Sequence, residues 1–136
     1  MDNKNIYDTG LYLRLSKDDA DVDGGKKTES NSISSQRDIL RAYVQSHEDL
    51  RIYDIYIDDG YSGANFERPE FQRMMADVRA GKVNCVLVKD LSRFGRDYIE
   101  AGRFIQKTFP ALNVRFIAVT DGFDSLYADK TDSSLI

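Results

Sequence analysis

The sequence predicts an α/β fold with a mostly parallel sheet. Short apolar or β-branched segments alternate with amphipathic helical segments along the chain, and the connections between them are short. This alternation is typical of a Rossmann-like or flavodoxin-like sheet of about four to five strands with helices on both faces. The 136 residues suffice for one such domain with a real core. Ligands of these sheets bind at the carboxyl ends of the strands, so residues there are the first candidates for a site.

The first predicted strand covers residues 6–16. Within it, leucines alternate with Tyr12, Arg14 and Ser16, so an extended chain places the leucines on one face. An arginine on a central strand is costly unless its charge is used or paired. The strand therefore presents a serine at its end with a fixed cation two residues before it. Spacing alone leaves an ordinary edge strand with a solvated face as an equal alternative.

The segment after this strand is a predicted loop, because residues 17–31 are polar and contain adjacent glycines. A helix over about 32–47 follows, with Asn31 or Ser32 as its cap. A β-rich strand over 51–57 comes next and stops at a run of two aspartates and a glycine.

The second half of the chain continues the alternation. Pro69 suits the first turn of a helix, because its missing N–H would be unpaired there anyway. The pattern predicts, in order, a helix from Pro69 to Gly81, an apolar strand over 83–88, a helix over about 97–108 closed by Pro110, and a strand over 114–119. From Phe123 onward the chain is polar, and no element is predicted.

Several arginines and one serine lie near or after the carboxyl ends of the predicted strands: Arg14, Arg68, Arg93, Arg96 and Ser16. The sequence holds a single histidine, so this set does not resemble an acyl-transfer triad. The planar fork of arginine matches phosphate oxygens and stabilises the charge that develops in phosphoryl transfer. The chemistry suggested is serine attack on phosphorus with arginines as the electrostatic catalyst. The plainer interpretation of Arg93 and Arg96, three residues apart, is two solvated charges on one helical turn.

The composition excludes other classes. One cysteine, Cys85, and one histidine exclude a disulfide framework and a zinc site of the ordinary ligand type. There is neither an apolar run long enough to span a bilayer nor a signal-peptide pattern, so we expect no membrane association and a cytoplasmic location. The net charge of −4 argues against a dedicated nucleic-acid-binding domain, although a local anion site is compatible with an acidic domain.

Ordered motifs along the chain resemble the serine recombinase (resolvase/invertase) catalytic domain. They are Tyr12-Leu13-Arg14-Leu15-Ser16, Ser32-Ile33-Ser34-Ser35-Gln36, Asp58-Asp59-Gly60-Tyr61-Ser62-Gly63, Arg68-Pro69-Glu70-Phe71 and Val88-Lys89-Asp90-Leu91-Ser92-Arg93-Phe94-Gly95-Arg96-Asp97. The loop before Gln36 and the segment 97–102 look most like large serine recombinases of mobile elements, of the transposon type. We therefore expect residues 1–136 to be such a catalytic domain, ending before the family's long dimerisation helix and DNA-binding domains.

The resemblance implies site-specific DNA recombination without metal or nucleotide cofactor. Ser16 would attack the scissile phosphodiester and give a 5′-phosphoseryl DNA intermediate, followed by strand exchange and religation. The implied phosphate-binding residues are Arg14, Arg68, Arg93 and Arg96, and the implied supporting residues are Gln36 and Ser62. The implied partners are double-stranded DNA recombination sites and further copies of the full-length protein, as a homodimer that assembles into a homotetramer. We expect the isolated domain to be inactive, with its loop 17–31 and arginines in place only after assembly.

Two departures and two alternatives accompany the resemblance. Ser92 stands where many small resolvases carry an aspartate, and a family lysine in the helix after Arg68 has no clear counterpart here. One alternative is a receiver-like phosphotransfer domain that uses Asp58, Asp59 or Asp90 with Mg²⁺. These acids are equally explained as strand terminators and helix-starting residues. The other alternative is a non-catalytic assembly module.

Overall fold

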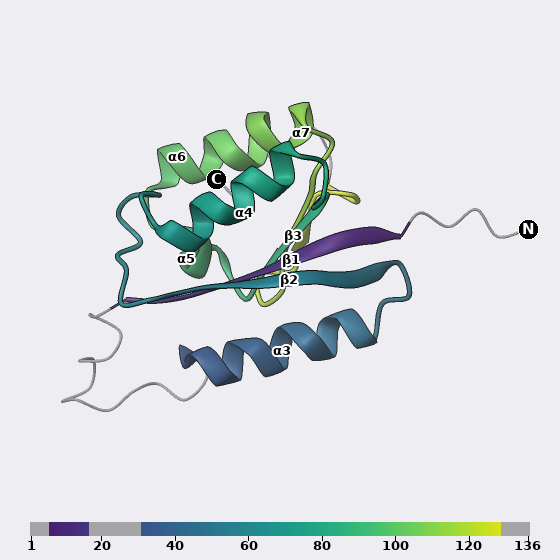
Figure 1. The fold of residues 1–136 in the computed structure, drawn as a ribbon, viewed down its shortest axis with the longest axis horizontal. Helices are drawn as coiled ribbons and strands as arrows, with labels where there is room; N and C mark the ends of the chain where they lie inside the picture. The colour runs from purple at the N-terminus through teal and green to yellow at the C-terminus, as the bar shows by residue number, and fades with distance from the viewer. Residues whose placement is uncertain (1–5, 17–30, 129–136) are drawn as a thin grey trace, which may run out of the picture.

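A five-stranded sheet forms the centre of the molecule (Figure 1). The computed structural model describes residues 6–16 and 31–128. The strand order is β2-β1-β3-β4-β5, in which the first four strands are parallel and β5 is antiparallel to β4. The predicted mostly parallel sheet is confirmed. The alternative of an edge strand for β1 is wrong, because β1 pairs with β2 on one side and β3 on the other.

The strands are β1 (Tyr7–Leu15), β2 (Leu50–Asp59), β3 (Cys85–Val88), β4 (Arg115–Ala118) and β5 (Phe123–Asp124). The helical elements are α3 (Ile33–Gln45), α4 (Pro69–Arg79), α5 (Leu91–Phe94), α6 (Tyr98–Arg103), the π-helical turn η2 (Phe104–Thr108) and α7 (Phe109–Ala111). Helix α3 covers one face of the sheet, and α4 and α6 cover the other (Figure 1). None of the helices in this part of the chain is long and apolar enough to cross a membrane. The predicted loop 17–31 lies outside the described residues except for Asn31.

The alternation in β1 divides the core between the two faces of the sheet. Leu11 and Leu13 lie in the cluster that includes Leu40 and Val44 of α3. Tyr12 lies in the other cluster, which contains most of the aromatic side chains. The expectation that both faces of β1 are covered is confirmed, since all three of these β1 side chains are fully buried.

Two helix starts agree with the local signals in the sequence. The Ser32 hydroxyl accepts the backbone N–H of Ser35 at 3.1 Å and caps α3. Pro69 is the first residue of α4. Pro110, in contrast, does not close the helical region. It lies in the last turn of a helical stretch that runs without a break from Tyr98 to Ala111, and the helix ends one residue after it.

An aromatic cluster attaches α5 to the core. Phe94, the last residue of α5, is fully buried, and its ring centroid lies 5.7 Å from that of Phe71 and 4.9 Å from that of Phe116. The next residue is Gly95, where an added Cβ would collide with the Phe66 ring. The aromatic core therefore fixes the segment that connects Arg93 to the following helix.

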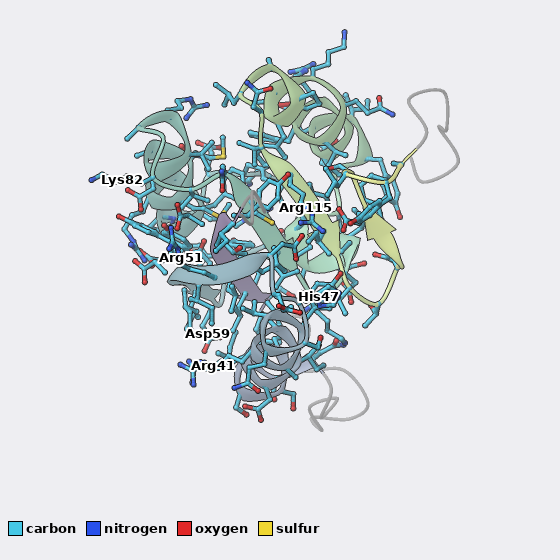
Figure 2. All side chains as sticks on the ribbon, turned by 90° about the vertical axis from the view of Figure 1, so that its right-hand side faces the viewer. Arg41, His47, Arg51, Asp59, Lys82 and Arg115 are labelled. Atoms are coloured by element: carbon cyan, nitrogen blue, oxygen red, sulfur yellow. The ribbon has the colours of Figure 1, made fainter. Side chains whose placement is uncertain are left out.

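Arg115 closes the end of the sheet opposite the carboxyl ends of the strands (Figure 2). Its Nε and Nη2 donate to the two carboxylate oxygens of Asp124 at 2.9 and 2.6 Å. Its Nη1 donates to Asp49, which precedes β2, at 2.8 Å. This buried cation therefore joins β4 to β5 and to the start of β2.

Candidate active site

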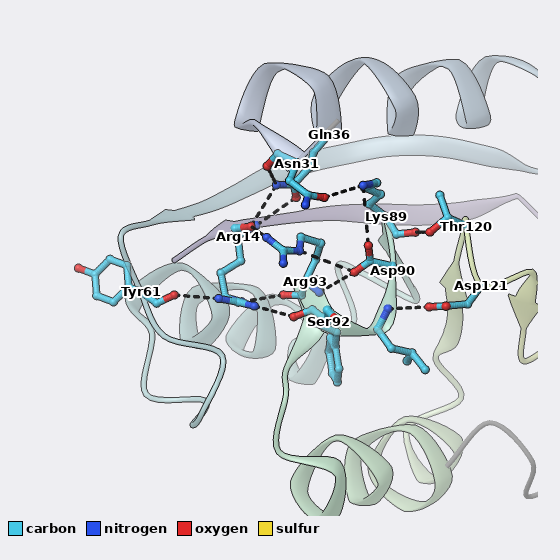
Figure 3. Close-up of polar contacts among 12 residues, drawn as sticks. Arg14, Asn31, Gln36, Tyr61, Lys89, Asp90, Ser92, Arg93, Thr120 and Asp121 are labelled. Atoms are coloured by element: carbon cyan, nitrogen blue, oxygen red, sulfur yellow. Dashed lines mark hydrogen bonds and ion pairs between the residues drawn. The ribbon is translucent and has the colours of Figure 1, made fainter. Parts of the chain in front are cut away.

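Arg14 lies near the carboxyl end of β1 with none of its surface exposed. Its guanidinium donates to three backbone carbonyls: Nε to Arg93 at 3.0 Å, Nη1 to Tyr61 at 3.0 Å and Nη2 to Ser92 at 2.6 Å (Figure 3). These bonds join β1 to α5 and to the loop after β2. The free-energy cost of burying this arginine is thus offset by hydrogen bonds to neutral carbonyls rather than by a carboxylate.

Gln36 holds the backbone of Arg14. Its Oε1 accepts the Arg14 N–H at 3.3 Å, and its Nε2 donates to the carbonyls of Arg14 and Asn31 at 3.0 and 2.8 Å (Figure 3). The Cα register of β1 with β3 covers only Thr9, Gly10 and Leu11. Beside Arg14, two residues before Ser16, the side-chain amide of Gln36 therefore takes the place of β3, while β2 remains paired on the other side.

Arg68 precedes α4 and is 1% exposed. Its Nη1 donates to the Tyr12 hydroxyl and to the Phe94 carbonyl, both at 2.9 Å. The Tyr12 hydroxyl in turn donates to Asp58 at 2.8 Å. Among the described residues the buried Nη2 of Arg68 has no hydrogen-bond partner. Burial raises the pKa of Tyr12, so this phenol stays protonated and continues to donate.

Asp58, near the end of β2, binds the first N–H groups of α4 with its carboxylate. Its Oδ1 accepts the N–H of Glu70 at 3.0 Å, and its Oδ2 accepts the N–H of Phe71 at 3.0 Å as well as the Tyr12 hydroxyl. Asp90 has a similar role in α5, where its Oδ1 accepts the N–H of Arg93 at 2.8 Å. Both acids are therefore helix-starting residues. In the described part of the chain, no three His, Cys, Asp or Glu side chains gather as a metal ion would require.

Arg93 and Arg96 differ in burial. Arg93 is 6% exposed, its Nη1 donates to the Arg14 carbonyl at 3.3 Å, and its Nε lies 3.7 Å from Asp90. Arg96 is exposed. The interpretation of these arginines as two solvated charges on one helical turn is therefore wrong, because α5 ends at Phe94 and buries Arg93.

The loop after β2 meets both Arg14 and Arg96 at Gly63. The Gly63 carbonyl accepts the backbone N–H of Arg96 at 2.8 Å. A Cβ built on Gly63 would lie 2.7 Å from Nη2 of Arg14 and 3.0 Å from Nε of Arg96, so a larger residue here would displace the Arg14 guanidinium. Ser62 next to it is exposed, and its hydroxyl accepts the Ala64 N–H at 2.9 Å. The observed bond of the Ser62 side chain thus belongs to the turn.

Ser16 directly follows β1 and is 3% exposed. It lies at the end of the sheet where the parallel strands have their carboxyl ends and where the arginines gather. Burial, followed by the charges of Arg93 and Arg68, lowers the pKa of Arg14 to about 10. Because the Arg14 guanidinium donates to neutral carbonyls, its positive charge is available to an anion.

Two further residues at this end of the sheet were not predicted as site residues. Tyr12 was assigned only to the polar face of its strand, yet it bridges Arg68 and Asp58. Lys89 follows β3 directly and is 8% exposed, and its Nζ donates to the Asn31 side chain at 2.6 Å. Its position at a strand end was the signal that could have included it.

Known proteins are similar to this chain in sequence and in fold. The family model "Resolvase, N terminal domain" matches residues 9–135. The N-terminal catalytic domain of TP901-1 integrase is similar, with a TM-score of 0.76 and 27% identity over 91% of this chain and 85% of that one. A resolvase family site-specific recombinase from Streptococcus pneumoniae gives a TM-score of 0.73 and 32% identity, over 95% and 83% of the two chains. "Uncharacterized immunity region protein 3" of Bacillus phage phi105 is 31% identical over 81 residues, which is 60% of this chain and 90% of that protein.

A family match over nearly the entire sequence agrees with the order of motifs and with the arginine-rich end of the sheet. The chain belongs to the Resolvase N-terminal domain family and is a serine recombinase catalytic domain, which implies DNA binding and site-specific DNA recombination.

Proposed function

We propose that Ser16 is the nucleophile for DNA cleavage. Its hydroxyl oxygen attacks the scissile phosphorus, the new Oγ–P bond forms and the P–O3′ bond breaks. The hydroxyl proton of Ser16 leaves, and the 3′ oxygen gains a proton, so the products are a 5′-phosphoseryl linkage and a free 3′-hydroxyl. The observation that carries this proposal is the place of Ser16, buried at the end of β1 and two residues beyond the backbone that Gln36 and Arg93 both bind.

The arginines supply the electrostatic stabilisation. Negative charge builds on the phosphate oxygens in the transition state, and fixed cations in a water-poor site stabilise it strongly. Arg14 and Arg68 donate to carbonyls and to a phenol, so their charges remain available to an anion. Arg93 and Arg96 lie nearer the surface and are the first candidates for direct contact with the phosphate.

Strand exchange requires partners beyond this domain. We infer that the full-length protein binds double-stranded recombination sites as a homodimer and exchanges strands as a homotetramer. The net charge of −4 supports the inference that other parts of the full-length protein supply most of the affinity for DNA, because general affinity for DNA comes from many basic contacts. The phosphoseryl bond retains the energy of the phosphodiester, so rejoining needs no nucleotide cofactor.

The experiment traps the covalent intermediate. The full-length protein is incubated with a supercoiled plasmid that carries its recombination sites, the reaction is stopped with denaturant, and protein attached to 5′ DNA ends is measured. Ser16→Ala should abolish this adduct, while Ser46→Ala at the exposed end of α3 should leave it unchanged. An adduct that persists in Ser16→Ala would exclude Ser16 as the nucleophile. Loss of the wild-type adduct in EDTA would instead favour a Mg²⁺-dependent reaction.

A further inference from the structure

The helix that carries Arg93 is unusually short. Helix α5 has four residues, Leu91–Phe94, and a single turn is not stable by itself because helix nucleation costs more than one turn returns. The position of Arg93 therefore depends on what holds the two ends of α5. Both ends are held by side chains from distant segments.

The carbonyl end of α5 is held by arginines of the site. Arg14 donates to the carbonyls of Ser92 and Arg93, and Arg68 donates to the carbonyl of Phe94. The last carbonyls of a helix have no partner within it, and cations are favoured there. Arg14 and Arg68 thus stabilise the same short helix that presents Arg93.

The amino end of α5 is held by two carboxylates. Asp90 is local and accepts the N–H of Arg93 at 2.8 Å. Asp121 is 30 residues away, in the turn between β4 and β5, and its Oδ2 accepts the N–H of Leu91 at 2.7 Å (Figure 3). Nothing in the motifs of the active site points to Asp121.

The turn that carries Asp121 is itself fixed to the end of β3. The N–H and hydroxyl of Thr120 both donate to the Lys89 carbonyl, at 2.8 and 3.0 Å, and the N–H of Val119 donates to the Val88 carbonyl at 3.0 Å. The exposed Asp121 carboxylate is therefore presented by a rigid support. The bond from Leu91 to Asp121 extends this series of hydrogen bonds by one residue, from the end of β3 to the first residue of α5.

The outer side of α5 is otherwise open. A hollow of about 390 Å³ lies between the turn and α5, with Ser92 and Arg96 on one side and Thr120 and Asp121 on the other. Since side-chain packing does not fill this space, the bond from Leu91 to Asp121 has a large share in orienting the helix.

We infer that Asp121 is a positioning residue for DNA cleavage, which fixes the first N–H of α5 and thereby the direction of Arg93. This inference rests on the proposed function of Ser16 and the arginines. Asp121 acts through the backbone of Leu91 and does not contact the phosphate. Because misplacement of a catalytic group by about 1 Å can cost up to ~100-fold in rate, loss of this bond should affect catalysis more than folding.

The test compares two substitutions at position 121 in the full-length protein. Asp121→Ala should slow formation of the serine–DNA adduct by about 10-fold, with DNA binding unchanged. Asp121→Asn should stay within ~3-fold of wild type, because the amide oxygen still accepts the Leu91 N–H. Equal rates for the alanine variant and the wild type, or equal losses in both variants, would overturn the inference.

A control removes an aspartate that accepts a backbone N–H elsewhere in the fold. Asp54 in the middle of β2 accepts the N–H of Ile55 at 2.7 Å, and its other oxygen accepts Nη1 of Arg73, also at 2.7 Å. Asp54→Ala should therefore lose at least as much thermal stability as Asp121→Ala, with an unchanged cleavage rate. A loss of cleavage in Asp54→Ala as large as that in Asp121→Ala would mean that stability, not positioning, is measured.

A double-variant cycle asks whether Asp121 acts through Arg93. In an Arg93→Lys background, Asp121→Ala should cost clearly less than in the wild type, since coupled residues are not additive. Fully additive losses would contradict the route through α5. Failure of the proposed function is seen separately: an adduct in Ser16→Ala rejects the nucleophile, whereas a wild-type rate in Asp121→Ala rejects only the role of Asp121.

Discussion

Two strand arginines, at opposite ends of the same sheet, are buried in different ways. Arg115 at the start of β4 is 4% exposed and lies between the carboxylates of Asp49 and Asp124. Arg14 near the end of β1 is fully buried, and its three bonds go to neutral carbonyls. One cation is neutralised by its surroundings, and the other is not.

The pKa shifts of the two groups follow this difference. Hydrogen bonds to Asp124 raise the pKa of Arg115, despite its burial. Burial and then the charges of Arg93 and Arg68 lower the pKa of Arg14 to about 10. A buried cation whose bonds go to neutral carbonyls, with other cations close by, is characteristic of a site for a negatively charged substrate. A neutralised arginine such as Arg115 instead stabilises the fold by connecting neighbouring segments.

Substitution of Arg14 should have the largest effect. Arg14→Gln removes the cation that we propose stabilises the reacting phosphate and disrupts its bonds to three carbonyls, so we expect cleavage to fall by about 10²- to 10³-fold. The measurement is adduct formation per folded molecule, with the folded fraction taken from circular dichroism. Cleavage within ~3-fold of wild type would remove Arg14 from the electrostatic catalyst.

Substitution of Arg115 should affect stability alone. Arg115→Met leaves Asp49 and Asp124 without their cation, and we expect a loss of about 2 kcal/mol in the free energy of unfolding, because both carboxylates are partly exposed and regain water. Urea unfolding measures this loss. Cleavage per folded molecule should not change. A large drop in cleavage would show that Arg115 contributes to the reaction as well as to stability.

The smallest effect is expected where charge is kept and geometry is lost. Arg93→Lys retains the cation but not the planar fork, so cleavage should fall by at least ~10-fold, which is about 1.4 kcal/mol of barrier. Thermal stability should remain close to that of wild type. Near-normal cleavage would show that a point charge suffices at this position and that directed hydrogen bonds to the phosphate are not needed.

Local signals made much of the fold predictable. The cap at Ser32 and the helix start at Pro69 depend on neighbouring residues only, and both were predicted. The strand Phe123–Asp124 was missed because two residues show no alternation, and the four-residue helix Leu91–Phe94 was missed because one turn shows no periodicity. Such short elements are stabilised by tertiary contacts that sequence patterns do not contain.

The site was predictable in its location but not in its bonds. Alternation and topology placed Arg14 and Ser16 at the carboxyl end of a central strand, where the structure has them. The partners of the Arg14 guanidinium, Tyr61 and Ser92, are 47 and 78 residues away and bind through their backbones, so side-chain chemistry gives no signal for them. The burial of Arg93 likewise depends on packing rather than on its own surroundings in the sequence.

The amide of Gln36 gives the carboxyl end of β1 two different neighbours. On one side, the register of β1 with β2 continues to Leu15, which lies opposite Asp59. On the other side, the register with β3 ends at Leu11, and the hydrogen-bond partner of the Arg14 backbone is the Gln36 side chain. A shift of α3 relative to the sheet would therefore pull on the backbone of Arg14, two residues before Ser16.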